Sequence, residues 1–73
     1  MKVYTQNKGA VYDFGNVWVS EYYCEFVIFN RLANTEKSCI LGQYSTEERA
    51  RGVLYEMLDA YKRKERIFYM PTT

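Results

Sequence analysis

Apolar residues recur at helical spacing over residues Ser45–Lys64, the longest regular pattern in the chain. Positions i, i+3, i+4, i+7, i+8 and i+11 of this pattern are Ala50, Val53, Leu54, Met57, Leu58 and Tyr61. This spacing places them on one stripe of a helix, whereas a strand would divide them between two faces. A helix with one apolar stripe is not stable alone in water. The pattern therefore predicts a helix that packs on the rest of the chain.

The ends and the interior of this helix carry further signals. Ser45 followed by Glu48 has the spacing of a capping box, and Thr46 is the alternative cap. Gly52 costs about 1 kcal/mol relative to alanine in a helix interior, and a close approach of another backbone would account for its presence. Cations cluster at residues 62–66, and we interpret them as complements to the negative end of the helix dipole rather than as a phosphate site.

Extended segments precede and follow the helix. They are Lys2–Gln6, Ala10–Phe14, Val17–Ser20, Glu21–Leu32, Ser38–Tyr44 and, before Pro71, Arg66–Met70. Turn residues at 7–9 predict that the first two segments form a hairpin, and Gly15–Asn16 marks the next turn. Two alternatives stay open. Residues 17–30 form one bent strand or two strands, and the tail adds an edge strand or folds back over the helix.

The expected fold is α+β: an antiparallel sheet of four to five strands with one long amphipathic helix packed on one face, in a single domain over residues 1–73. Residues 22–30 are apolar on both faces, which is typical of a central strand. We expect them to pair with residues 37–44, which places positions 30 and 39 nearly opposite each other. Gly42 predicts a bulge or a close backbone contact. One helix leaves a sheet face uncovered, so we expect a homodimer or a higher homo-oligomer that hides this face.

Composition and charge narrow the range of expected binding partners. Aromatic residues make up 18% of the chain, eight of them tyrosines, and the net charge is +1. Without a basic excess, we expect no nonspecific binding to nucleic acid or to membranes. No apolar run reaches the roughly 18 to 20 residues that span a bilayer, and the first ten residues lack the core of a signal peptide. The expected location is the cytoplasm.

The residues for catalytic chemistry are largely missing. The chain has no histidine, which excludes Ser–His and Cys–His nucleophile systems, and its four glycines form no phosphate loop. The carboxylates form no recognised acid–base or metal motif. We interpret Glu25, the one acid in an apolar strand, as solvent-facing or paired with a cation. Cys24 and Cys39 fit free buried thiols better than a metal site. We therefore expect no enzymatic activity, no metal and no cofactor.

Aromatic residues of the predicted strands are the candidates for contacts. Trp18, Tyr22, Tyr23 and Tyr44 have faces on which bases stack, but their nearby cations are only Arg31 and Lys37. Core or dimer contacts therefore explain the aromatics better. A pocket for a small nucleotide between subunits is the other possibility, with Tyr22, Arg31, Arg66 and Tyr69 as contributors. The residues singled out for partner or ligand binding are Trp18, Tyr22, Tyr23, Arg31, Arg66 and Tyr69.

The C-terminal half carries an ordered set of motifs, LGQYSTEERARGVLYEM at Leu41–Met57 and FYMP at Phe68–Pro71. It resembles small accessory proteins encoded by phages and prophages of Gram-positive bacteria. In these proteins a strand ending in LG-x-Y precedes an S/T-E-E-R-A helix start, a VL-x-E-M/I helix core and a terminal Y/F-x-MP. The resemblance implies a strand, a capped helix and a tail, and it brings no catalytic residues.

This resemblance also implies a function class. Small non-enzymatic phage proteins often antagonise bacterial immunity by occupancy, so the resemblance leads us to expect a protein that binds and blocks a host defence effector, as anti-CRISPR proteins do. One alternative is an oligomeric sponge that sequesters a nucleotide immune signal. Another is a structural or assembly accessory protein.

Overall fold

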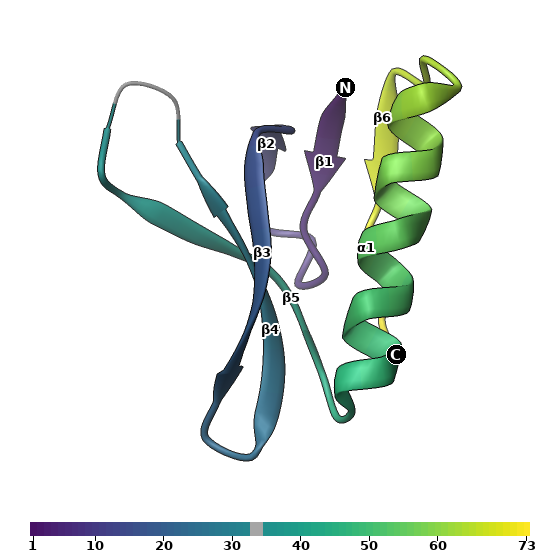
Figure 1. Ribbon diagram of the computed structural model, residues 1–73. Helices are drawn as coiled ribbons and strands as arrows, with labels where there is room; N and C mark the ends of the chain where they lie inside the picture. The colour runs from purple at the N-terminus through teal and green to yellow at the C-terminus, as the bar shows by residue number, and fades with distance from the viewer. Residues whose placement is uncertain (33–34) are drawn as a thin grey trace.

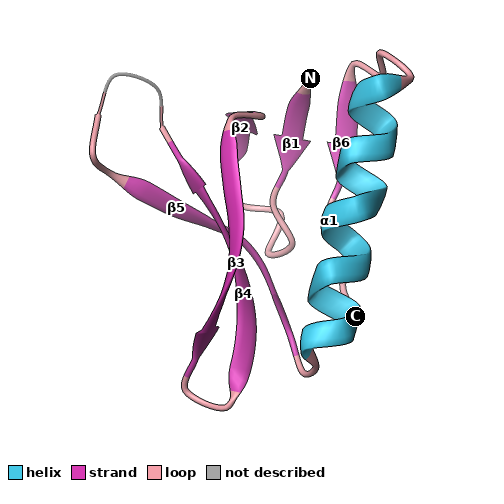
Figure 2. Cartoon of the chain, viewed as in Figure 1, coloured by secondary structure: helices cyan, strands magenta, loops and turns pink. Residues whose placement is uncertain are grey.

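The computed structural model describes residues 1–32 and 35–73, and in it one α-helix packs against two three-stranded sheets (Figure 1). The elements are β1 Lys2–Tyr4, β2 Val11–Asp13, β3 Asn16–Tyr22, β4 Glu25–Arg31, β5 Ser38–Tyr44, α1 Glu47–Lys62 and β6 Ile67–Tyr69. We call the sheet with strand order β3-β4-β5 the meander sheet, and the sheet with order β2-β1-β6 the terminal sheet (Figure 2). The α+β class with one helix on a sheet is confirmed.

The expectation of a single antiparallel sheet of four to five strands is wrong. β1 and β2 form the predicted hairpin, with Val3 opposite Tyr12. On its other side β1 pairs in parallel with β6, with Val3 opposite Phe68. The tail is therefore an edge strand, as one of the two alternatives proposed. Two segments from opposite ends of the chain make this pairing, so no local sequence pattern indicates it.

A buried asparagine holds the corner where the chain leaves one sheet for the other. Asn30 on β4 is only 1% exposed. Its side-chain NH₂ donates to the carbonyl oxygen of Asp13 at 3.1 Å, and its side-chain oxygen accepts from the N–H of Gly15 at 3.1 Å. Asp13 ends β2 and Gly15 precedes β3, so Asn30 joins the end of the terminal sheet to the middle strand of the meander sheet.

Gln6 makes the second connection between the sheets, at the outer edge of β5. Its backbone N–H donates to the carbonyl of Leu41 at 2.8 Å. Its side chain accepts from the N–H of Gln43 at 2.8 Å and donates to the carbonyl of Gln43 at 3.0 Å. The amide side chain thus imitates a neighbouring strand and closes this edge of the meander sheet.

β3 and β4 are two strands, which resolves the open alternative for residues 17–30. The antiparallel pair runs from Asn16 opposite Arg31 to Tyr22 opposite Glu25, so Tyr23 and Cys24 form the turn. The predicted segment starting at Glu21 therefore contains a turn, because β-forming side chains occupy the positions where glycine or asparagine usually signals one. The expectation of a buried thiol is wrong for Cys24, which is exposed at this turn.

β5 spans the predicted residues, and its pairing with β4 places Asn30 opposite Cys39 as expected. The register shifts between Ile28 opposite Gly42 and Phe29 opposite Ile40, so the predicted irregularity at Gly42 is confirmed. A Cβ at Gly42 would lie 2.9 Å from Tyr44 Oη and 3.0 Å from Met70 Cε. Any side chain at this position would therefore have to displace the ends of the Tyr44 and Met70 side chains.

The helix begins at the second of the two N-cap residues that the sequence predicts. Thr46 is the N-cap, and its hydroxyl accepts from the N–H of Arg49 at 3.1 Å. The helix ends at Lys62, two residues before the predicted boundary. There Lys64 has φ 60°, and the N–H of Glu65 donates to the carbonyl of Ala60 at 3.1 Å. This is a Schellman ending with lysine at the position that glycine usually occupies.

The buried stripe of the helix is rotated relative to the predicted one. Its buried residues are Ala50, Val53, Met57 and Ala60, whereas Leu58 is 39% exposed and Tyr61 is 55% exposed. Ala60 lies outside the predicted stripe because its small side chain contributes little to an apolar pattern. A close approach of another backbone does not account for Gly52, since no described atom outside the helix's own backbone lies within 4 Å of a Cβ built there.

The core lies between the helix and both sheets. Its central cluster of buried residues contains Val3, Ile28, Leu41, Tyr44, Ala50, Val53, Met57 and Met70. Val3 comes from the terminal sheet, Ile28 and Leu41 come from the meander sheet, and Met57 comes from the helix. Tyr44 Oη donates to the carbonyl of Pro71 at 2.8 Å, and burial raises the pKa of Tyr44 to about 12. The tail is thereby attached to the meander sheet.

Candidate protein-binding surface

The register of the meander sheet divides its side chains between two faces. Ile28 and its cross-strand neighbour Val19 point to the core. Because successive side chains alternate, the other face holds Asn16, Trp18, Ser20 and Tyr22 of β3, Glu25, Val27, Phe29 and Arg31 of β4, and Ser38, Ile40 and Gln43 of β5. We call this the outer face. It lies opposite the face that contacts the helix and the core.

An apolar row crosses the outer face on all three strands. Trp18 is paired with Phe29, and Phe29 is paired with Ile40. The rings of Trp18 and Phe29 are stacked, with centroids 5.5 Å apart and planes at 19°. Trp18 is 37% exposed and Ile40 is 50% exposed. Cross-strand apolar rows of this kind stabilise a sheet, and here the row also gives the outer face a hydrophobic centre.

Tyr22 and Tyr23 form an aromatic tip at the β3–β4 turn, which Figure 1 shows at the lower end of the meander sheet. Tyr22 is 52% exposed and Tyr23 is 82% exposed. Their rings meet edge to face, with centroids 4.6 Å apart and planes at 84°. Tyr23 has φ 49°, the left-handed region that a bulky residue rarely adopts. This conformation costs about 1–2 kcal/mol for an L-residue.

The outer face carries one acid and one base, at opposite ends of β4. Glu25 is the neighbour of Tyr22, and Arg31 lies between Asn16 and Ser38. They are six positions apart, which corresponds to about 20 Å along a strand. Neither takes part in an ion pair with the described residues. The expectation that Glu25 faces out of the core agrees with this position.

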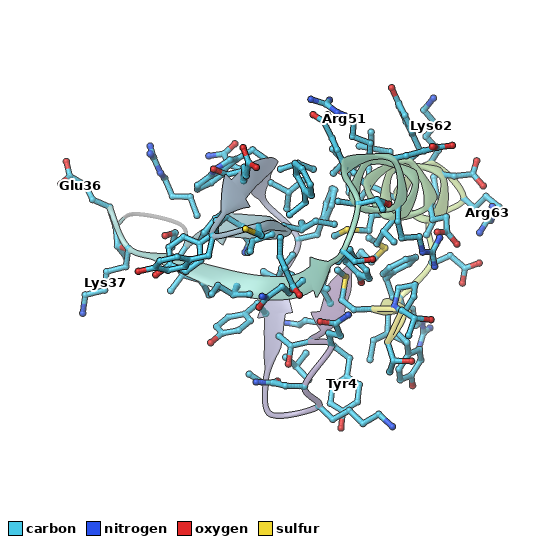
Figure 3. All side chains as sticks on the ribbon, turned by 90° about the horizontal axis from the view of Figure 1, so that it is seen from below. Tyr4, Glu36, Lys37, Arg51, Lys62 and Arg63 are labelled. Atoms are coloured by element: carbon cyan, nitrogen blue, oxygen red, sulfur yellow. The ribbon has the colours of Figure 1, made fainter. Side chains whose placement is uncertain are left out.

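The structure brings four of the six predicted contact residues to one surface. Trp18, Tyr22 and Arg31 share the outer face, and Tyr23 adjoins it through Tyr22. Arg66 and Tyr69 lie elsewhere, before and at the end of β6. Tyr69 packs edge to face on Tyr4, with centroids 5.7 Å apart. Figure 3 shows Tyr4 pointing away from the helix.

The set of residues considered for a nucleotide pocket is therefore not assembled within one chain. Tyr22 and Arg31 lie at opposite ends of the β3–β4 pair, and Arg66 and Tyr69 belong to the other sheet. Tyr44, considered for base stacking, is buried in the core at 3% exposure. Lys37 lies before β5, at the far end of the molecule from the helix (Figure 3).

Sequence reasoning missed Phe29 and Ile40 as members of the surface. The alternation within β4 places Phe29 on the same face as Glu25 and Val27. For β5 the corresponding signal is interrupted, because the bulge at Leu41–Gly42 reverses the alternation between Ile40 and Tyr44. Ile40 is consequently assigned to the outer face only once the register with Phe29 is known.

A second feature is a hollow of about 490 Å³ beside the C-terminal end of α1, lined by Met1, Tyr61, Lys62, Lys64 and Glu65. The Tyr61 ring lies against Phe14, with centroids 5.2 Å apart. Arg63, next to the hollow, makes ion pairs with Asp59 and with Glu65. Figure 3 shows Lys62 and Arg63 projecting from the helix into solvent.

Two further titratable groups have a pKa that departs from its ordinary value. Burial raises the pKa of the half-buried Cys39 thiol, which also donates to the carbonyl of Asn30 at 3.5 Å. A hydrogen bond from Lys2, together with its charge, lowers the pKa of the exposed Asp13 carboxyl. Among the described residues, no three histidine, cysteine or acidic side chains gather as metal ligands would, and no helix has the length and apolar character to cross a membrane.

Comparison with protein-family models, with curated proteins and with solved structures gave no match for this chain. The surface must therefore be interpreted from its own residues.

Proposed function

We propose that this chain is a binding protein that acts by occupancy, and that its aromatic tip is the anchor for a protein partner. The resemblance of the C-terminal half to phage and prophage accessory proteins supports a defence effector of a bacterial host as that partner. In this proposal the chain blocks the effector by covering part of its surface.

The observation that carries the proposal is the backbone conformation of Tyr23. A two-residue hairpin turn of this kind favours glycine at its first central position. Here a tyrosine occupies that position with φ 49° and exposes 82% of its surface. Strained and exposed residues cluster at functional sites, and tyrosine is among the residue types that dominate binding energy at interfaces.

The charges near the tip favour a protein over a nucleic acid. The closest charged residues along the hairpin are Glu21 and Glu25, whose carboxylates repel phosphate groups. Surfaces that bind single strands combine stacked aromatics with basic side chains. Arg31, the base on the outer face, is about 20 Å from Glu25. An aromatic anchor with acidic neighbours suits a protein surface that offers an apolar pocket beside basic residues.

The sharpest test replaces Tyr23 with the residue that the turn prefers. Tyr23→Gly relieves the left-handed strain of about 1–2 kcal/mol and removes an edge-to-face pair of about 0.5–1.5 kcal/mol. These terms nearly cancel, so the thermal midpoint stays close to that of the native chain. Loss of the anchor raises the Kd for the partner at least about thirtyfold.

Two control variants separate the anchor from the backbone and from aromatic residues in general. Lys8→Gly changes a second exposed residue with positive φ, 61°, and Tyr55→Ala removes a helix tyrosine that is 69% exposed. The immobilised proteins are incubated with lysates of Gram-positive cells that carry antiviral defences. The native chain and both controls should retain one host protein that Tyr23→Gly loses. Equal capture by all four proteins, or no capture by the native chain, would contradict the proposal.

The hollow at the end of α1 favours a second candidate, binding of a small nucleotide. Tyr61 offers a ring face, Lys62 and Lys64 offer cations, and about 490 Å³ is within the size range of small-molecule sites. A thermal-shift panel of cyclic and ADP-ribose-type nucleotides tests this candidate. A rise in the midpoint that Lys62→Glu and Lys64→Glu abolish would support it, and unchanged melting curves would exclude it.

A further inference from the structure

The outer face of the meander sheet has a charge pattern that matches itself. Along β4 the residues of this face are Glu25, Val27, Phe29 and Arg31, in that order. An acid therefore stands at one end, a base at the other, and an apolar centre between them. In the rows that the register defines, no other charged side chain shares this face. A rotation of 180° about an axis that passes between Val27 and Phe29 exchanges the acidic end and the basic end of β4.

We infer that a second copy of this chain covers the outer face, with its β4 antiparallel to the first. In a two-fold interface every contact between two different residues occurs twice, once in each direction between the copies. Glu25 and Arg31 are about 20 Å apart, so each lies about 10 Å from the axis. Glu25 of each copy then lies over Arg31 of the other, and the Trp18–Phe29 row of each copy lies over the Ser20–Val27 row of the other, so that the two aromatic rows flank the axis. Sheets that pack face to face with strands about 30° apart keep these ends within side-chain reach.

The outer face is better suited to a second copy than the β5 edge of the sheet. Gln6 already closes the β5 edge with hydrogen bonds to Leu41 and Gln43. Val27 points to the outer face yet is fully buried without belonging to the central cluster, so this face has a small apolar layer of its own. Three strands of seven residues cover about 14 Å by 23 Å. This is small for a stable interface, and we expect a Kd in the micromolar range.

This dimer is compatible with the proposed anchor and does not depend on it. The aromatic tips lie beyond Glu25, at the two ends of the paired β4 strands, so a dimer presents two of them. Dimerisation is measured on the purified chain without any host protein. Failure of the dimer and failure of partner capture are thus separate results.

The test uses two single charge reversals and their mixture, followed by sedimentation velocity from about 1 to about 300 µM, a range that brackets a micromolar Kd. Glu25→Arg places like charges together at both ends of the interface, and so does Arg31→Glu. Like-charge contacts oppose association strongly, so each variant alone should dimerise with a Kd raised at least about tenfold. In an equimolar mixture the reversed charges face each other, and a mixed dimer should form about as tightly as the native one. The double variant Glu25→Arg/Arg31→Glu should also dimerise about as tightly as the native chain.

The recovery distinguishes a broken charge contact at this interface from a general loss of folding. Both reversals are at surface positions, and unchanged far-UV circular dichroism of each variant shows that the fold is retained. Salt at about 1 M should narrow the difference between the native chain and the single variants, because the Debye length falls to about 3 Å. A native chain that stays monomeric at the highest concentration would overturn the inference and leave the face to another partner. Single variants that dimerise like the native chain, or a mixture that does not recover, would overturn the arrangement.

Discussion

The two sheets of this protein are stabilised in different ways. Each strand of the meander sheet has seven residues, and its strands follow one another along the chain. Each strand of the terminal sheet has three residues, and one of its two pairings joins β1 to β6 from opposite ends of the chain. Local pairing has a low cost in loop closure, and pairing between chain ends has a higher one. We therefore expect the meander sheet to be the more persistent part and the terminal sheet to open first.

The outward faces of the sheets differ in a related way. The terminal sheet exposes a row formed by Val11, Tyr4 and Tyr69, and beside it Lys2 makes an ion pair with Asp13 at 2.5 Å. The meander sheet exposes the Trp18–Phe29–Ile40 row, and its two charged residues are unpaired among the described residues. Since both sheets have an exposed apolar row, such a row alone does not indicate a partner. The unpaired charges and the strained Tyr23 distinguish the meander sheet.

The largest expected effect tests whether the meander sheet is the more persistent part of the fold. Ile28→Ala removes a fully buried side chain at the centre of β4. We expect a loss of about 4 kcal/mol in the free energy of unfolding, a large part of a typical total. The matched control is Ile40→Ala on the outer face, where the side chain is 50% exposed and the loss should stay below about 1 kcal/mol. Urea unfolding of both variants measures the difference, and equal losses would contradict the assignment of the two faces.

The next effect concerns the connection between the sheets. Asn30→Leu keeps the branched shape of the side chain but removes its hydrogen bonds to Asp13 and Gly15. We expect a loss of about 2 kcal/mol, because two backbone groups lose their partners. Amide hydrogen exchange should show β1 and β2 losing protection more than β4. A uniform loss across both sheets would show that the two sheets open as one unit.

A smaller effect is expected at the edge that Gln6 closes. Gln6→Ala removes the side-chain bonds to Gln43 and to the carbonyl of Pro71. The site is partly exposed, and water replaces some of these bonds, so we expect a loss of about 1 kcal/mol. The exposed Gln43 contributes its backbone to these bonds, and Gln43→Ala should leave stability nearly unchanged. A larger loss for Gln43→Ala than for Gln6→Ala would refute the strand-like role of the Gln6 amide.

The smallest effect depends on pH and on the contact between Tyr44 and Pro71. Burial raises the pKa of Tyr44 from its ordinary 10.0 to about 12, so the folded chain holds this proton more tightly than the unfolded chain. The resulting stability is present below about pH 10 and is lost as the pH rises toward about 12. The variant Tyr44→Phe lacks this pH-dependent contribution. It also loses one hydrogen bond, which lowers the free energy of unfolding by about 1 kcal/mol. The difference between the thermal midpoints of the native chain and Tyr44→Phe should therefore narrow from about pH 8 to about pH 11, and a constant difference would contradict the buried, neutral hydroxyl.

The candidate surface is only partly predictable from the sequence. Tyr22, Tyr23, Trp18 and Arg31 are identifiable because aromatic residues and their nearest cation stand out in a short β-rich segment. Their arrangement requires the register of three strands. The strain at Tyr23 has no signal in the sequence, because no glycine or asparagine marks the turn.

The sequence by itself determined the elements that depend on neighbouring residues. These are the helix with its acidic first turn and its cap within one residue, the N-terminal hairpin, and β5 with the irregularity at Gly42. Each follows from periodicity, capping or turn chemistry within a few positions. Tertiary structure decided the division into two sheets, the parallel pairing of β1 with β6, and the rotation of the helix that buries Ala60 and exposes Leu58. These features depend on contacts between residues far apart in the chain, and the energy of such contacts is determined by packing rather than by any local pattern.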